Sequence, residues 1–157
     1  MTLRTLRHRR IPTRTPAGED NGFLLEIYNE HDGFVADGRE PRQVYLTVCR
    51  PGQRKGPHLH MKRWGYFTCI AGNARVVAKI GDEYAIEYTG EDHEFRTIEV
   101  PAGAPALLEN IGDVDAYILN TPSPAWSAAD PDDHPVLDWS PPDAVRRVHP
   151  RDRGRTR

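Results

Sequence analysis

The stretch that decides the fold is GQRKGPHLHMKRWGYFTCIAG, residues 52–72. It contains two histidines, His58 and His60, separated by a single residue. On an extended strand, side chains at positions i and i+2 point to the same face. Gly52 and Gly72 bound the stretch, and glycines allow the sharp turns that bring a strand to the mouth of a barrel. We therefore expect both imidazoles on the inner face of a closed sheet.

Length and composition set the class of the protein. The chain has 157 residues, of which 38% are hydrophobic and 28% charged, enough for one domain with a core. It has no long apolar run, and its N-terminus lacks an apolar signal segment, so we expect no membrane partner. Its two cysteines, Cys49 and Cys69, are too few for a disulfide framework. A reducing, cytoplasmic location is therefore predicted.

Arginines gather at both ends of the chain. Residues 1–14 carry five arginines and no acid, and residues 146–157 carry six arginines and one acid. Two interpretations stay open: anion- or nucleic-acid-binding tails, or solvated ends that lie against the acidic body. Neither tail has interleaved aromatic residues or a known nucleic-acid module, so we expect no nucleic-acid partner. We predict a basic flexible leader (1–21), one domain with a Pro-rich C-terminal arm (22–145) and a basic disordered tail (146–157).

Short β-branched and aromatic segments separated by turn residues predict strands. They cover residues 23–28, 43–49, the His58 and His60 segment, 66–71, 74–80, 83–89, 96–100, 106–110 and 116–120. Gly72-Asn73 and Gly112-Asp113 are turn signals, which predict that the strands on either side of each turn pair with one another. Residues 121–143 are rich in Pro, Asp and Ala, and we expect an irregular arm whose Trp126 and Trp139 pack onto the body. Many short strands without long helices predict a sandwich or barrel.

Two segments resemble the sequence motifs of cupins. Gly52, His58, His60 and Gly72 have the spacing of the first motif, although Gly65 stands where a glutamate is usual. The segment PAGAPALLEN, residues 101–110, has the spacing of the second motif, with Ala106 at the histidine position. The resemblance, over residues 45–121, implies an all-β fold with little helix: the double-stranded β-helix, or jelly roll.

The same resemblance bears on metal binding. A cupin metal site resembles a first shell of three histidines and one carboxylate, and of those four ligands only His58 and His60 remain. Asp92, His93 or Glu109 would have to complete a shell from outside the histidine and glutamate positions of the motifs. We therefore expect no metal and no cofactor, and keep a metal-dependent cupin enzyme as a third hypothesis.

Further resemblances narrow the family. Residues 76–121 resemble the cupin domain of bacterial capsule and deoxysugar epimerases, and residues 121–124 and 136–141 stand where dTDP-4-dehydrorhamnose 3,5-epimerases carry a Pro-rich arm. The cluster of Arg54, His58, His60 and Lys62, with Tyr45 on the preceding strand, is similar to dTDP-sugar 3,4-ketoisomerases. These RmlC-like cupins are dimers that act on nucleotide-linked 4-keto sugars. The resemblance implies a dTDP-type substrate and a homodimer, which we expect to form through edge strands near residues 23–28.

These residues suggest a metal-independent epimerase or ketoisomerase of a nucleotide-linked 4-keto-6-deoxy sugar. A histidine with an ordinary pKa can remove the proton beside the ketone at neutral pH. We expect His58 as the base and His60 as its partner. The remaining candidates are Arg54, Lys62 and Arg63 as stabilising cations, Tyr45 or Tyr117 as the acid, and Glu109 as a further substrate contact. The alternative is a non-catalytic cupin that binds a small ligand or sugar and has lost the acid as well as the metal. Separately, the histidines and tyrosines could be packing residues.

Overall fold

The computed structural model describes residues 2–143, which form short strands and one helical turn. No helix in this part of the chain is long and apolar enough to cross a membrane. The elements are β1 (Thr5–Arg7), β2 (Ile11–Arg14), β3 (Asp20–Leu24), η1 (Glu30–Asp32), β4 (Tyr45–Cys49), β5 (Arg54–His58), β6 (Gly65–Ala71), β7 (Asn73–Ile80), β8 (Glu83–Gly90), β9 (Arg96–Val100), β10 (Ala106–Asn110) and β11 (Ala116–Asn120).

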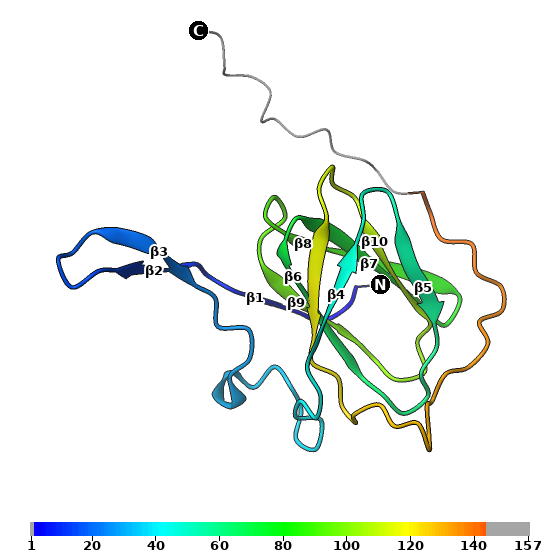
Figure 1. The fold of residues 1–157 in the computed structure, drawn as a ribbon. Helices are drawn as coiled ribbons and strands as arrows, with labels where there is room; N and C mark the ends of the chain where they lie inside the picture. The colour runs from blue at the N-terminus through cyan, green and yellow to red at the C-terminus, as the bar shows by residue number, and fades with distance from the viewer. Residues whose placement is uncertain (1, 144–157) are drawn as a thin grey trace, which may run out of the picture.

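Two antiparallel sheets face each other and form the body of the molecule (Figure 1). The five-stranded sheet has the order β1-β9-β6-β11-β4, and the four-stranded sheet has the order β5-β10-β7-β8. From β4 onward the other predicted strands are present within a few residues of their expected limits, whereas β5 ends at His58 and lies mostly before the predicted His58 and His60 segment. The predicted all-β jelly roll is confirmed.

The turn at Gly72 does not close the hairpin that the sequence predicted. β6 and β7 lie in different sheets, so Gly72 carries the chain across from one sheet to the other. Its φ is 73°, and a Cβ there would lie 2.6 Å from the carbonyl oxygen of Asp115, which explains why a glycine is needed. The predicted pairing of β10 with β11 is wrong in the same way. Turn residues signal a change of direction, but they do not say which sheet the next strand joins.

The core consists of alternate residues from the two facing sheets. Ala74, Val76 and Ala78 of β7 are fully buried and belong to one cluster with Ile98 of β9 and Ile118 of β11. The two-residue period of a strand places these side chains on the inner face. Burying each branched aliphatic side chain contributes roughly 1.5–3 kcal/mol relative to exposure, so this cluster holds the sheets together.

A buried threonine links the two sheets along one edge. Thr89 of β8 is fully buried, and its Oγ1 accepts a hydrogen bond from the Cys69 amide on β6 (3.2 Å). The same hydroxyl donates to the carbonyl oxygen of Arg96 on β9 at 2.7 Å. At the opposite edge, β4 and β5 are the terminal strands of their sheets. The interior is therefore closed near Thr89, and the candidate site lies at the other edge.

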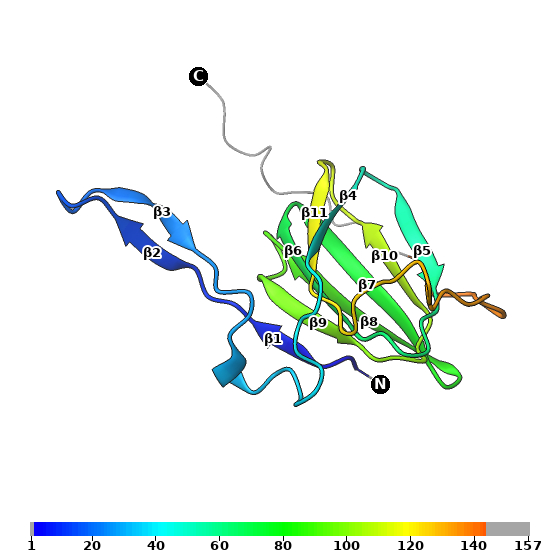
Figure 2. The ribbon, with the colours of Figure 1, turned by 60° about the horizontal axis from the view of Figure 1, so that its bottom comes forward.

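The N-terminal segment differs from the flexible leader that the sequence predicted. β1 pairs with β9, and the buried His8 places Nε2 2.6 Å from Oγ1 of Thr97. β2 and β3 form a hairpin that projects away from the two sheets (Figures 1 and 2). The strand predicted over residues 23–28 is β3, which ends at Leu24. Ile11, Phe23 and Leu24 on this hairpin are each about half exposed.

Residues 121–143 follow the body as an irregular arm (Figure 1). Trp139 packs edge-on against Tyr84, with ring centroids 5.3 Å apart and planes at 84°. Lys79 Nζ donates to the carbonyl oxygen of Asp138 at 3.0 Å, which holds the same part of the arm. Trp126 is 50% exposed, so it lacks the close packing that the sequence predicted for it. The predicted basic tail, 146–157, lies outside the described residues.

A buried ion pair gives the fold a testable weak point. The Arg75 side chain is 4% exposed and its Nη2 lies 2.7 Å from Oε2 of Glu109, which is 16% exposed. Glu109→Ala leaves the guanidinium buried without its carboxylate, and we expect a loss of about 3–5 kcal/mol in the free energy of unfolding. Urea denaturation followed by circular dichroism measures it.

The control is Arg7→Ala, which removes an exposed ion pair with Glu94 (3.0 Å, Arg7 side chain 65% exposed). Exposed pairs contribute at most about 1 kcal/mol. Equal losses in the two variants would contradict the assignment of the Arg75–Glu109 pair as a structural element.

Candidate active site

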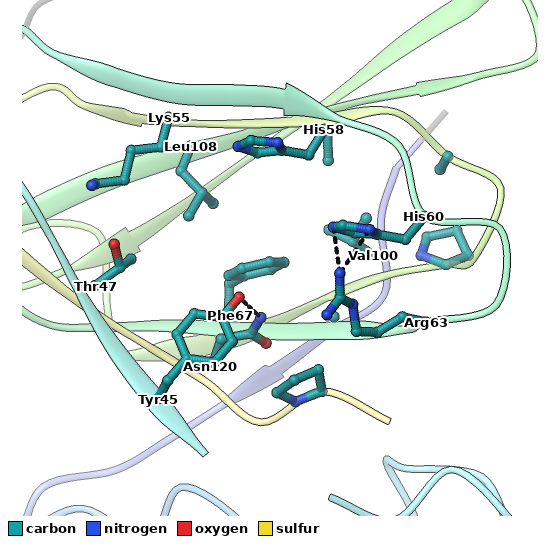
Figure 3. Close-up of a pocket in the computed structure, with 15 residues that line it drawn as sticks. Tyr45, Thr47, Lys55, His58, His60, Arg63, Phe67, Val100, Leu108 and Asn120 are labelled. Carbon is teal, nitrogen blue, oxygen red and sulfur yellow. Dashed lines mark hydrogen bonds between the residues drawn. The ribbon is translucent and has the colours of Figure 1, made fainter. Parts of the chain in front are cut away.

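A cavity of about 150 Å³ lies between the two sheets, on the side of β4 and β5. Tyr45 and Thr47 line it from β4, and Lys55 and His58 line it from β5 (Figure 3). The remaining lining residues are His60, Arg63, Gly65, Phe67, Val100, Pro101, Ala104, Ala106, Leu108, Asn120 and Pro122. The wall is thus mostly apolar with a few convergent polar groups, the usual character of a small-ligand site.

Both histidines of the opening stretch point into this cavity (Figure 3). His58 is the last residue of β5, and His60 follows the isolated bridge between Leu59 and His134. Their rings are nearly parallel, with centroids 6.3 Å apart and planes at 11°. The structure therefore places the two imidazoles on one inner face, where the i, i+2 spacing predicted them.

A register shift in β5 adds a third polar side chain that the sequence analysis missed. Ala106 faces His58 and Leu108 faces Lys55, so β5 holds one more residue than β10 between these pairs. Such a bulge turns a side chain toward the other face of a strand. Lys55 consequently lines the cavity together with His58. Strict alternation would have placed residues 55 and 58 on opposite faces, and no sequence signal marked the bulge except Gly56.

The two motif positions without a metal ligand also face the cavity. Gly65 and Ala106 both line it, so the positions of the cupin ligand set converge here, but neither carries a donor atom. A Cβ at Gly65 would lie 2.5 Å from Cε2 of Phe67, so the phenyl ring fills the space where a longer side chain would lie. Within residues 2–143 no group of three or more His, Cys, Asp or Glu side chains is arranged to hold a metal. These residues do not fit the cupin metal.

His60 is half-buried among groups that bear on its charge. Its Nδ1 lies 2.8 Å from the carbonyl oxygen of Asp132 and 3.3 Å from Oδ1 of Asp133. Nη2 of Arg63 lies 2.8 Å from Nδ1 and 3.3 Å from Nε2. Burial, helped by the positive charge of Arg63, lowers the pKa of His60 below its ordinary 6.5 and outweighs the opposing effects of Asp132 and Asp133. The imidazole is therefore neutral at neutral pH and able to accept a proton.

Of the two predicted acids, Tyr45 lies in the cavity and Tyr117 lies outside it. The Tyr45 hydroxyl accepts a hydrogen bond from Nδ2 of Asn120 at 2.7 Å inside the cavity (Figure 3). Asn120 Oδ1 accepts from the Tyr66 amide at 2.9 Å, which fixes the orientation of the Asn120 amide. Tyr117 lies beside the inward-facing Ile118 and points outward, 39% exposed. Alternation along β11 excludes Tyr117 from the cavity.

The predicted substrate contacts likewise lie partly inside and partly outside the cavity. Arg63 lines the cavity. Lys62 points away from it and pairs with Asp130, and Arg54 is exposed on β5 outside the cavity lining. Glu109 lies on the outer face of β10 in the ion pair with Arg75. Arg54, Lys62 and Glu109 are thus replaced as cavity polar groups by Lys55, Thr47 and Asn120.

Comparison of the sequence with models of protein families gives one match. A family model described as the polysaccharide biosynthesis C-terminal domain matches residues 20–134. No curated protein matches the chain.

Several solved structures share the fold. The 3'-monoepimerase ChmJ from Streptomyces bikiniensis, solved with dTDP-quinovose, has a TM-score of 0.68 at 17% identity, with 97% of this chain and 83% of ChmJ covered. The 3,4-ketoisomerase QdtA from Thermoanaerobacterium thermosaccharolyticum has a TM-score of 0.62 at 15% identity, with 82% and 84% covered. The capsular polysaccharide assembling protein CapF from Staphylococcus aureus has a TM-score of 0.56 at 24% identity, with 60% of this chain covered. The match spans only 28% of CapF. These neighbours confirm the predicted RmlC-like cupin fold.

The bulge in β5 predicts a specific effect of adding one methyl group. Gly56 has a φ of 98°, and a Cβ there would lie 2.8 Å from the carbonyl oxygen of Ala106. We expect Gly56→Ala to lower the free energy of unfolding by at least ~2 kcal/mol, because backbone strain adds to a clash with the neighbouring strand. Chemical denaturation measures the loss.

Gly38→Ala is the matched control, since Gly38 has a φ of 79° and no atom within 4 Å of its added Cβ. This control carries only the backbone cost, about 1 kcal/mol. A loss at Gly56 no larger than at Gly38 would show that the bulge does not depend on the missing side chain.

Proposed function

Because the chain belongs to the polysaccharide biosynthesis C-terminal domain family, we propose that it is an isomerase or epimerase of a nucleotide-linked 4-keto-6-deoxy sugar. The observation that carries the proposal is the pair of parallel imidazoles in one small cavity, flanked by Lys55 and Arg63 and without a third metal ligand. Such a site suits proton transfer at a carbon beside a ketone. The neighbours QdtA and ChmJ, by their names a ketoisomerase and an epimerase, support the reaction class.

The first step is proton abstraction. The C3 proton is acidified by the ketone at C4, and its removal leaves an enediolate whose negative charge lies on the former carbonyl oxygen. A neutral imidazole is a suitable base near pH 7. His58 and His60 both face the cavity, and the lowered pKa of His60 keeps that ring unprotonated. Arg63, whose Nη2 lies beside the His60 ring, is the cation that would stabilise the oxyanion.

The second step returns a proton without any net oxidation. Delivery to C3 from the opposite face inverts that carbon. Delivery to C4, with the proton of the C3 hydroxyl transferred to the oxygen at C4, leaves the ketone at C3 and gives the 3-keto isomer. Tyr45 is the proposed acid. Its oxygen already accepts from Asn120, so its own proton is available to the substrate. It projects from β4, across the cavity from the histidines on the β5 side (Figure 3).

The size of the cavity bears on how a substrate would lie. We place the sugar inside the cavity of about 150 Å³ and the larger nucleotide outside it. Lys55, exposed on the edge strand β5, is positioned to meet the diphosphate. The QdtA structure contains TDP-4-keto-6-deoxyglucose, which makes this compound the first substrate to test.

Deuterium wash-in tests the chemistry directly. Incubation with TDP-4-keto-6-deoxyglucose in D2O is expected to place deuterium at C3 or C4, observed by proton NMR. Loss of a general base or acid costs about 10²- to 10⁴-fold, so we expect such losses for His58→Asn, His60→Asn and Tyr45→Phe. Tyr117→Phe, which changes an outward-facing side chain, is expected to keep the full rate.

The controls separate the competing hypotheses. Binding of the nucleotide sugar without any exchange would overturn catalysis and support a non-catalytic sugar-binding protein. Stoichiometric metal in the purified protein that is lost in His58→Ala would revive the metal-dependent enzyme.

We also propose that the protein is a homodimer formed through the β2–β3 hairpin. An isolated two-stranded hairpin is marginally stable in water, and this one projects from the body (Figure 2). Ile11 and Leu24 face each other across it, and both are about half exposed, as is Phe23. Apolar side chains grouped in this way are typical of an interaction surface, and a second copy of the chain would cover them.

Light scattering coupled to size-exclusion chromatography is expected to give the mass of two chains. Leu24→Glu places a charge on the hairpin surface and is expected to yield a single-chain mass with the circular dichroism spectrum unchanged. Val114→Glu changes a similarly exposed apolar residue in the turn between β10 and β11 and is the control. A dimer that survives Leu24→Glu would place the interface elsewhere.

A further inference from the structure

Asp132 in the C-terminal arm is bound by the loop that follows His60. Its Oδ1 accepts from the Met61 amide at 2.9 Å, and its Oδ2 accepts from the amides of Lys62 and Arg63 at 3.0 Å each. Three successive backbone N–H groups around one carboxylate, two of them donating to Oδ2 and one to Oδ1, form an anion-binding concavity. Asp132 is buried, with 9% of its surface exposed. Its φ of 54° is a left-handed conformation that aspartate tolerates better than most residues. One carboxylate thus fixes the backbone of three residues in the loop.

The same residue also holds the ring of His60. The main-chain carbonyl oxygen of Asp132 lies 2.8 Å from Nδ1 of His60. A carbonyl oxygen only accepts hydrogen bonds, so this contact requires the tautomer in which Nδ1 carries the proton. Nε2, the nitrogen farther from the backbone, then keeps its lone pair.

Arg63 does not compete for this hydrogen bond. The in-plane directions of the two imidazole nitrogens diverge, so one atom within 3.3 Å of both cannot lie along either of them. Nη2 of Arg63 is 2.8 Å from Nδ1 and 3.3 Å from Nε2. The guanidinium therefore lies against the ring. The other charged or titratable groups that face His60 are Asp133, at 3.3 Å from Nδ1, and His58, whose ring is stacked 6.3 Å away.

Two further contacts fasten the arm on either side of Asp132. Ser123 and Trp64 exchange backbone hydrogen bonds of 2.8 and 3.1 Å, and the His134 amide donates to the Leu59 carbonyl at 3.0 Å. The His134 ring also lies 3.1 Å from Oδ1 of Asp132. The arm therefore spans the loop, with Asp132 between its two attachments.

The carboxylate stays charged across the working pH range. Burial opposes its ionisation, but the amides of Lys62, Met61 and Arg63, together with His134, outweigh burial and lower the pKa of Asp132 to about 2.

We propose that Asp132 is a positioning residue for the histidine base: its carboxylate holds the loop of residues 61–63, and its carbonyl oxygen selects the tautomer of His60 that presents the Nε2 lone pair to the substrate. The inference rests on the proposed function for its catalytic consequence. The His60 tautomer does not depend on the proposed function, and it is measured without substrate. Asp132 touches neither the cavity nor the reacting atoms, so it acts through His60.

The test uses the full chain labelled with nitrogen-15 at histidine. Ring-nitrogen shifts are expected to show His60 of the unmodified protein with its proton on Nδ1 at pH 7.5. Asp132→Asn keeps the size of the side chain but replaces one acceptor oxygen by a donor that faces the loop amides. We expect His60 to become a mixture of tautomers and the deuterium wash-in rate to fall about 10- to 100-fold, the usual effect of a displaced reacting group.

Asp130→Asn is the matched control. Asp130 is 59% exposed and contacts the Lys62 side chain but not its backbone amide, so neither the tautomer nor the rate is expected to change. Circular dichroism verifies that each variant is folded.

Each remaining outcome decides the proposal. An unmodified His60 with its proton on Nε2 overturns it, whatever the variant does. An unchanged tautomer and rate in folded Asp132→Asn overturns it as well. A tautomer shift in a protein that shows no deuterium exchange keeps the role of Asp132 and overturns the proposed function instead.

Discussion

The hydroxyl of Thr89 holds the two sheets together at one edge, and the character of the interior follows from that contact. It accepts from an amide of β6 and donates to a carbonyl of β9, so backbone groups of the facing sheet are satisfied across the gap. Near this edge the space between the sheets is filled by small and branched apolar side chains such as Ala85, Val76 and Ile98. At the other edge the terminal strands β4 and β5 belong to different sheets and do not pair with one another, and the same sandwich leaves a cavity.

Polar side chains outside the cavity differ in their hydrogen bonding from those that line the cavity. Asn110, at the asparagine position of the second motif, is 2% exposed and fully used: Nδ2 donates to the carbonyls of Cys49 and Val114 at 2.7 Å each, and Oδ1 accepts from the Gly112 amide. Its role is to tie the end of β10 to the end of β4. In the cavity, the Tyr45 hydroxyl accepts from Asn120, and both Tyr45 and His60 line the space for a ligand. Because buried polar groups normally have partners, polar groups that line such a space favour a binding or catalytic use.

The features that the sequence predicted correctly are those that the two-residue periodicity of a strand determines. Alternation located β4 and the strands from β6 to β11, and it placed His58 and His60 on the inner face. It also implied that Tyr117 and Ile118 face opposite ways, and Tyr117 is the one outside. Alternation could not identify which strands pair, because a turn glycine such as Gly72 serves equally well in a hairpin and in a crossing between sheets. Lys55 was missed because a bulge interrupts the alternation, and Asp132 because its partners lie about 70 residues earlier in an arm without periodicity.

The loss of two donor positions changes what the histidines have to do. In a complete cupin ligand set, a metal would withdraw electron density from a substrate carbonyl, and the imidazoles would be occupied as ligands. With Gly65 and Ala106 at the other two positions and the Phe67 ring beside them, the site is less polar and the imidazoles keep their lone pairs. An apolar wall strengthens the field of the cations that remain, because fewer dipoles screen them. Arg63 serves two purposes in this setting. Its charge helps to keep His60 neutral, and the same charge is available to an oxyanion formed beside it.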